Sequence, residues 1–254
     1  MTSVLCLVAH PDDETILCGG ALALLSGQGL EVHVAALTRG EGGEAGEPPL
    51  CARSELGTVR ARELAEAAAH LGVRGLHFLG YVDPEVGPGD TLSAPAHTPA
   101  VLAGQITALV AETQAAVVLT HGSNGEYGHP AHQLMHQITR AACAAGARPL
   151  WLYTFAASFP AHPYPRLTNA DDAADVVIDV RAVLDRKEAA ALNHATQTPL
   201  FVRRRSQAAG RPLTVREVLL PVEGYRRWQA APGEDLFLSA LRPWAVDGGA
   251  ASAG

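Results

Sequence analysis

Short runs of apolar residues alternate along the chain with longer segments in which apolar residues recur every three or four positions. The short runs are typical of strands buried on both faces, and the longer segments are typical of amphipathic helices. Strands are predicted at 4–9, 30–37, 75–80, "AAVVLT" ending at Thr120, "PLWLYTF" and 175–180. Helices are predicted in "ETILCGGALALLSGQG", "RSELGTVRARELAEAAAHLGV", 99–114, "HPAHQLMHQITRAACAAGA" and "RAVLDRKEAAALNHATQ". This order predicts an α/β fold with a mostly parallel sheet and helices on both faces.

The same pattern predicts a single domain. The 254 residues contain no internal repeat, and an α/β fold of this length commonly forms one unit. We expect that domain to cover residues 1–245. The segment 246–254, "VDGGAASAG", is rich in small residues, and we expect it to be a disordered tail.

Composition narrows the class of protein. The net charge of −7 argues against broad binding to nucleic acid or to an anionic membrane, because both need a basic surface. We expect no membrane span, since no apolar run is long enough, and no signal peptide. The four cysteines form no C-x-x-C pair, which favours reduced thiols in a cytoplasmic protein. The pattern leaves open whether the chain forms a homo-oligomer.

Polar segments follow four of the predicted strands. They are "HPDDE", "TRGEGGE", "GYVD" and "HGSNGEYGHPAH", in chain order. In open α/β sheets, ligands bind beyond the carboxyl ends of the strands, so we expect these segments to converge on one rim. The acids of "HPDDE" then line a site at the edge of the core and avoid the cost of burial within it.

Two of these segments carry residues typical of a catalytic metal site. His10 and Asp13 lie three positions apart across a turn, and His132 lies near a helix start. Two histidines and a carboxylate leave one position of a tetrahedral zinc open for water. Asp12 is then the candidate general base, and His129 is the candidate acid or oxyanion donor.

A purely structural interpretation must be weighed against this one. Acids at a helix start satisfy free N–H groups and the helix dipole, and a proline such as Pro130 is common in a first helical turn. Either cluster alone fits that interpretation. Both clusters together, on adjacent strand ends, favour a site.

These residues also carry a resemblance to a known family. "AHPDDE" (9–14) with "YGHPAH" (127–132) resembles the LmbE-like or PIG-L family of zinc-dependent de-N-acetylases. Members include deacetylases of mycothiol and bacillithiol biosynthesis and of N-acetylglucosaminyl-phosphatidylinositol. The resemblance extends over most of the chain, through "TRGEGGE", "RARE" (60–63), "LGYVD" and "DRKEAAALNHATQ" (185–197).

The resemblance implies a Rossmann-like three-layer sandwich and a set of residue roles. One Zn²⁺ per chain, or Fe²⁺ in its place, is implied at His10, Asp13 and His132. Asp12 is implied as the base, and His129 as the group that stabilises the transition state or donates a proton. Tyr127 is implied as an oxyanion contact, and Arg60 and Asp83 as contacts to the sugar or its aglycone.

One position departs from the family pattern. Ala131 stands where the family usually has an acid that orients the histidine two residues before it. Such a carboxylate fixes a histidine's tautomer and raises its pKa. The sequence therefore predicts that His129 lacks this partner, or takes its orientation from another group.

The expected function is removal of acetyl from an N-acetylglucosamine conjugate, such as a precursor of a low-molecular-weight thiol. The small-molecule substrate is then an amino sugar, and the enzyme is a hydrolase of linear amide C–N bonds. An amidase acting on thiol S-conjugates uses the same chemistry and stays open. A two-metal phosphoesterase needs more carboxylate ligands than the motifs offer. A nucleotide-binding module lacks its G-x-G-x-x-G signature after the first strand.

Overall fold

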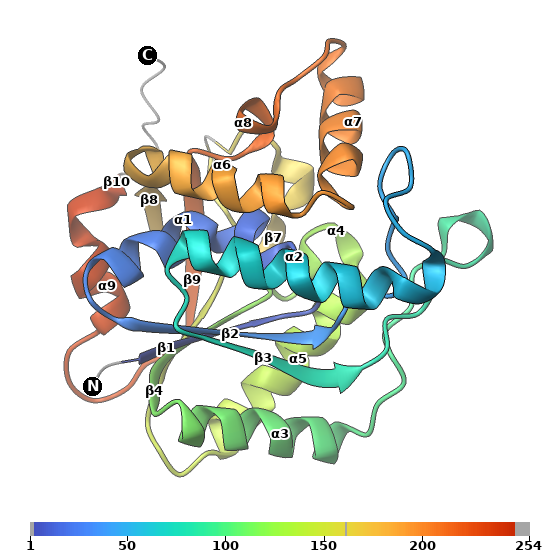
Figure 1. Ribbon diagram of the computed structural model, residues 1–254. Coiled ribbons are helices and arrows are strands. Elements are labelled where there is room, and N and C mark those ends of the chain that lie inside the picture. Colours follow the sequence, from blue (N-terminus) through green and yellow to red (C-terminus); the bar gives the residue numbers. More distant parts are fainter. Residues whose placement is uncertain (1–2, 161, 247–254) are drawn as a thin grey trace.

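The centre of the molecule is a parallel sheet built from the first five predicted strands. A computed structural model describes residues 3–160 and 162–246 (Figure 1). Neighbouring strands pair in parallel in the order β5-β4-β1-β2-β3. The strands are β1 Ser3–Val8, β2 Glu31–Thr38, β3 Gly75–Tyr81, β4 Ala115–Thr120 and β5 Trp151–Thr154.

Three antiparallel strands extend the sheet beyond β5, in the order β9-β8-β10. They are β9 Val222–Gln229, β8 Val176–Asp179 and β10 Ala245–Val246. The strand predicted at 175–180 is therefore present as β8, but it joins the sheet through β9. A separate two-stranded sheet consists of β6 Ala157–Ser158 and β7 Asn169–Ala173.

Helices cover both faces of the sheet, which confirms the predicted three-layer α/β fold (Figure 1). One face carries α1 Asp13–Gly27, α2 Leu56–Leu71, α6 Leu184–Asn193 and α9 Leu236–Leu241. The other face carries α3 Pro99–Glu112 and α5 Pro130–Ala145. The remaining helices are α4 Gly125–Gly128, α7 Thr198–Ala209 and α8 Val215–Val218, with 3₁₀ turns at Arg53–Glu55, Pro88–Asp90, Pro165–Leu167, Arg181–Val183 and Arg242–Trp244.

The surroundings of β1 and α1 explain why both sequences are largely apolar. All six residues of β1 are buried because helices cover both faces and β2 and β4 pair with both edges. Helix α1 is apolar around most of its circumference because it packs between the sheet and the outer helices. At Gly20 a side chain would collide with Val180 and Glu223, so the glycine permits this close packing.

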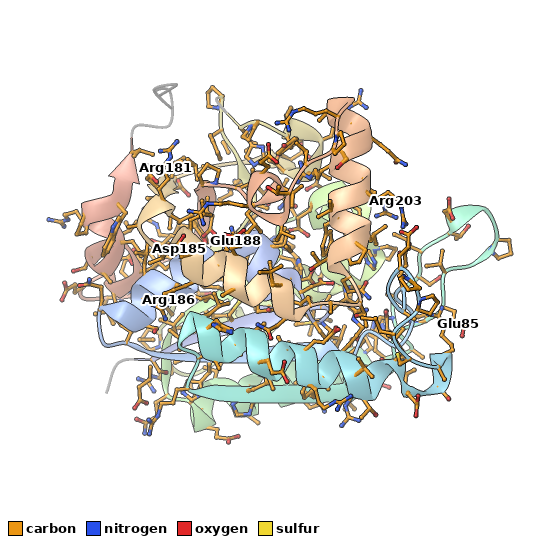
Figure 2. All side chains as sticks on the ribbon, turned by 45° about the horizontal axis from the view of Figure 1, so that its top comes forward. Glu85, Arg181, Asp185, Arg186, Glu188 and Arg203 are labelled. Atoms are coloured by element: carbon orange, nitrogen blue, oxygen red, sulfur yellow. The ribbon has the colours of Figure 1, made fainter. Side chains whose placement is uncertain are left out.

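The loop that follows β2 is held from two sides. Arg203 of α7 forms ion pairs with Glu44 and Glu47, and Arg53 pairs with Glu85 of the loop after β3. Arg203 and Glu85 both lie beside this loop in Figure 2. Arg203, Arg204 and Arg205, a run of three basic residues, all belong to α7.

The structure bears on two further predictions, the tail at 246–254 and the absence of a membrane span. Residues 247–254 of the predicted tail lie outside the described residues, and Val246 belongs to β10. Within residues 3–160 and 162–246, no helix has both the length and the apolar character needed to cross a bilayer.

Candidate metal centre

The sheet topology creates a crevice between the carboxyl ends of β1 and β4. From β1 the chain runs outward through β2 to β3 and then crosses back to β4 on the other side of β1. The connections after β1 and β4 therefore leave in opposite directions, which is where open α/β sheets bind ligands. Residues 10–13 follow β1, and residues 121–132 follow β4. The predicted convergence of these two segments is present in the structure.

Three side chains bring possible ligand atoms together, and a different oxygen of Asp13 faces each of the two histidines. His10 Nδ1 lies 3.4 Å from Asp13 Oδ2, and His132 Nε2 lies 3.4 Å from Asp13 Oδ1. His132 Nε2 and His10 Nδ1 are 3.3 Å apart. Metal–ligand bonds of roughly 2.1 Å in a tetrahedron put ligand atoms about 3.4 Å from one another. The separation of the two histidine nitrogens therefore suits a small tetrahedral cation, and either oxygen of Asp13 is near enough to one of them to be the third ligand.

The opposite nitrogen of each histidine faces a carboxylate. His132 Nδ1 donates to Glu126 Oε2 at 2.5 Å, so its Nε2 presents a lone pair. His10 Nε2 lies 3.3 Å from Asp83 Oδ1, although the two are too poorly aligned for a hydrogen bond. An acceptor in that position favours the proton on Nε2 and leaves a lone pair on Nδ1. Lone pairs of two histidines and Asp13 thus converge, as in metal sites whose histidines are oriented by carboxylates.

Without a metal, protons stabilise this cluster. Burial disfavours a charged His10, but the contacts with Asp13 and Asp83 outweigh it and raise the pKa of His10 to about 10. Burial also opposes ionisation of Asp13, yet His132, His10 and His121 hold its pKa well below the usual range. Metal binding therefore releases a proton from this cluster, as expected of a preformed site.

Two residues of the site, His121 and Glu126, were missed by the sequence analysis. Both are buried, and the two side chains are joined at 3.0 Å through His121 Nδ1. The amides of Gly122 and Asn169 donate to the other oxygen of Glu126. Their position in the polar segment that follows β4 was the sequence feature that could have identified them.

Two further triads have ligand atoms within 4.8 Å of one another: His10 with His129 and His132, and Asp13 with His121 and His132. In each of them one histidine has a ring nitrogen engaged by a backbone amide. Ala9 N–H donates to His121 Nε2, and Ala131 N–H donates to His129 Nδ1. In the triad of His10, Asp13 and His132, no backbone amide of the described residues engages the two facing ring nitrogens, and the His10 backbone N–H donates to Asp13 Oδ2 at 2.9 Å.

Asp12 lies beside the triad in a strained backbone conformation. Its φ of 111° and ψ of −33° are unusual for a residue with a side chain, and such strain concentrates at functional sites. The side chain is buried, and Arg60 Nη2 donates to its Oδ2 at 2.9 Å. Burial raises the pKa of Asp12 to about 7, and Arg60 limits the rise. A carboxyl group in this range can accept a proton near neutral pH.

The structure places Arg60 behind Asp12. Its side chain is 3% exposed and donates to the carbonyl oxygens of Pro11 and Gly40 as well as to Asp12. All of these contacts are within the protein. Asp83, in contrast, is only half-buried and faces His10 at the rim.

His129 is oriented by its own helix. It is the N-cap of α5, and its Nδ1 accepts the Ala131 N–H at 3.2 Å, so Nε2 carries the proton. No carboxylate among the described residues bonds to this ring. Burial and the neighbours His10 and His132 lower the pKa of His129 to about 3. Tyr127 is 51% exposed, and its ring centre lies 5.7 Å from that of His129.

The chain matches the family model for GlcNAc-PI de-N-acetylase (PIG-L) over residues 5–143. It is also similar to the 1D-myo-inositol 2-acetamido-2-deoxy-alpha-D-glucopyranoside deacetylase of Mycolicibacterium smegmatis. The two are 30% identical, and the match covers 89% of this chain and 89% of that protein. The family match includes the segments that carry the candidate centre.

Two solved structures share the fold. N,N'-diacetylchitobiose deacetylase from Pyrococcus horikoshii has a TM-score of 0.63 at 20% identity, over 92% of this chain and 88% of that one. The 4-carboxy-2-hydroxymuconate hydratase from Pseudomonas putida has a TM-score of 0.60 at 21% identity, over 92% and 99%. Because these two enzymes carry out different reactions on one fold, the reaction of this chain must be argued from its site.

Proposed function

The chain belongs to the GlcNAc-PI de-N-acetylase (PIG-L) family, and we propose that it is a metal-dependent hydrolase that removes the acetyl group from an N-acetylglucosamine conjugate. The observation that carries this proposal is the convergence of lone pairs from His10, Asp13 and His132 beside the buried carboxyl group of Asp12. That arrangement can hold a cation and a proton acceptor next to the same water molecule.

The residues His10, Asp13 and His132 are the proposed ligands of one Zn²⁺, with Fe²⁺ as the alternative. When bound, the ion supplies a Lewis acid and lowers the pKa of water to roughly 7. Nitrogen and carboxylate ligands at tetrahedral spacing suit zinc. Both other triads share His132 with this one, which favours a single ion over a two-metal phosphoesterase.

Asp12 is the proposed general base. It accepts a proton from the water whose oxygen attacks the acetyl carbonyl carbon. The same carboxyl group then returns that proton to the amide nitrogen as the C–N bond breaks, so that acetate and the free amine leave. Arg60 holds the carboxylate in place through its 2.9 Å contact, and we assign it this positioning role in preference to a substrate contact.

His129 is the proposed oxyanion donor. Its Nε2–H is neutral, and it donates a hydrogen bond to the carbonyl oxygen as negative charge develops there. A pKa of about 3 argues against an imidazolium that acts as an acid at neutral pH. Tyr127 at the mouth is the proposed second contact to that oxygen, and Asp83 is proposed to orient His10 and to meet the sugar.

The substrate class follows from family membership and from the relatives. The mycobacterial protein is named as a deacetylase of an inositol conjugate of N-acetylglucosamine. For this chain we propose a substrate in which an acetylated amino sugar is joined to an aglycone. An assay must identify that aglycone. Amidase action on a thiol S-conjugate is the second candidate, because it requires the same base and metal.

The proposal is tested with purified protein of known metal content. We expect one metal ion per chain and release of acetate from N-acetylglucosaminyl-inositol, with Asp12→Asn keeping the metal and losing roughly 10²–10⁴-fold in kcat. Amine release from an S-conjugate but not from the sugar would assign the second candidate. Full activity of Asp12→Asn, or two metal ions per chain, contradicts the proposed mechanism.

A further inference from the structure

A second buried carboxylate lies directly behind the proposed base. Glu14 is 0% exposed, and its Oε2 accepts the backbone N–H of Asp12 at 2.9 Å. The side chain therefore contacts a residue of the site whose backbone is strained. It does not contact the three proposed ligands through any hydrogen bond that the described residues show.

This contact replaces an ordinary helix cap. The N-cap residue of a helix usually adopts an extended backbone, and its side chain accepts an N–H of the first turn. Asp12 is the N-cap of α1, but with φ at 111° its side chain makes no capping bond. Its carboxylate contacts Arg60 instead. Glu14 holds the backbone of Asp12 while the carboxylate of Asp12 stays available for chemistry.

Glu14 is itself fixed from a distant part of the chain. His194, the residue that ends α6, places Nε2 2.8 Å from Glu14 Oε1. The hydroxyl of Thr15 donates to the same oxygen at 2.5 Å. Both side chains are buried. A carboxylate oxygen accepts, so His194 Nε2 carries the proton and donates.

We infer that Glu14 and His194 are positioning residues of the reaction, and that they act by holding the strained backbone of Asp12. The inference rests on the proposed function, in which Asp12 is the base. A misplacement of about 1 Å at a reacting group can cost 10²-fold in rate. Loss of the His194 contact should therefore lower kcat and leave substrate binding unchanged.

The test compares two amides at position 194. The shorter His194→Asn does not reach Glu14, and His194→Gln brings an N–H near the place of Nε2. We expect His194→Asn to lower kcat about 10- to 100-fold at unchanged KM and metal content, and His194→Gln to restore most of kcat. If His194→Asn does not fold, Glu14→Gln examines the same contact from the other side.

A double variant shows whether the effect passes through Asp12. In an Asp12→Asn background, His194→Asn should cause no further loss of kcat, because the base is already absent. Full additivity overturns the inference but leaves Asp12 as the base. An active Asp12→Asn enzyme overturns both. Equal losses of kcat in the Asn and Gln variants at position 194 also overturn the inference.

The matched control lies on the same pair of helices. Lys187 of α6 contacts Glu223 at 2.6 Å, and Glu223 accepts the N–H groups of Gly20 and Ala21 in α1. Lys187→Met disturbs α1 and α6 without touching Asp12 or Glu14. We expect it to leave kcat unchanged; a loss equal to that of His194→Asn would reduce the role of His194 to general packing and refute the inference.

Discussion

Two buried clusters of charged side chains contact helix α1 about two turns apart, and they are built in opposite ways. In the cluster around Glu223, each of the two carboxylate oxygens accepts two hydrogen bonds. The donors are the amides of Gly20 and Ala21, the Lys187 ammonium and the Tyr225 hydroxyl. This cluster joins α1, α6 and β9, and its polar groups are paired as a stable interior requires.

The cluster at the start of α1 is incompletely paired. Among the described residues, His10 Nε2, Arg60 Nε and His194 Nδ1 are buried without a hydrogen-bond partner. Asp12 and Glu126 both have positive φ. Unpaired buried atoms and backbone strain destabilise a fold. They persist mainly where they serve binding or chemistry, because contacts elsewhere stabilise the structure. The comparison indicates that burial of charge alone does not mark a functional site, and that in the cluster at the start of α1 unpaired atoms and backbone strain occur together.

The largest effect that we predict from this comparison is on stability. Lys187→Met removes one partner of a buried ion pair and leaves the charge of Glu223, which should lower the free energy of unfolding by about 3–5 kcal/mol. Denaturant unfolding measures this change, and an assay at a temperature where the variant is folded should give unchanged kcat. A loss below 1 kcal/mol would contradict the structural role of the pair.

A smaller effect is expected from the carboxylate that orients the metal centre. Glu126→Gln places an amide donor where His132 Nδ1 and His121 Nδ1 now find an acceptor. Loss of such a contact typically weakens metal affinity 10- to 100-fold, which competition with a chelator measures.

The control for Glu126→Gln is Glu63→Gln. Glu63 is also a buried glutamate, and it accepts from the amide and hydroxyl of Thr196, away from the proposed ligands. Equal metal affinities of the two variants would show that Glu126 does not orient a ligand.

The smallest effect should come from His129→Gln. A glutamine amide can donate a neutral N–H near the place of His129 Nε2, so kcat should fall by less than about tenfold. A loss of more than 10²-fold, as expected for a missing general acid, would contradict the oxyanion role.

The pH dependence of kcat/KM also tests whether His129 acts as an oxyanion donor or as an acid. With a pKa of about 3, His129 is neutral above about pH 5 and contributes no limb to the kcat/KM profile there. The acid limb belongs to Asp12, since kcat/KM falls as pH falls and this group becomes protonated. Its pKa is about 7 in the metal-free protein, and a bound cation lowers it. A basic limb that His129→Gln abolishes would show that His129 acts as an acid.

The parallel half of the fold was predictable because its strands are buried on both faces. Such strands appear in the sequence as continuous apolar runs, and their order places the polar segments at one rim. Of the antiparallel edge, only β8 was predicted. In β9, "VEGYRRWQ", Glu223 and Gly224 interrupt the pattern. Arg226, which stacks on Trp228, and its neighbour Arg227 occupy positions where apolar residues were expected. The three arginines of α7 obscured a helix in the same way.

In the proposed site, the sequence analysis named the residues of the two motifs but not His121 and Glu126, which contact them. Glu126 is one acid in a glycine-rich loop, and its importance comes from a fold that brings it to His132 and His121. Arg60 was expected at the substrate, but only the structure shows how deeply it lies behind Asp12. The pairing of His194 with Glu14 joins residues 180 positions apart, a contact that no local pattern predicts.

The separation of the proposed ligands along the chain has a consequence for protein synthesis. His10 and His132 are 122 positions apart, so the ribosome delivers the first two ligand groups roughly 6–24 s before the third, at 5–20 residues per second. The nascent chain lacks the third ligand during that interval, and the set of three converges only after β4 has paired with β1. If these three residues are the ligands, we therefore expect metal to be acquired after that pairing has formed.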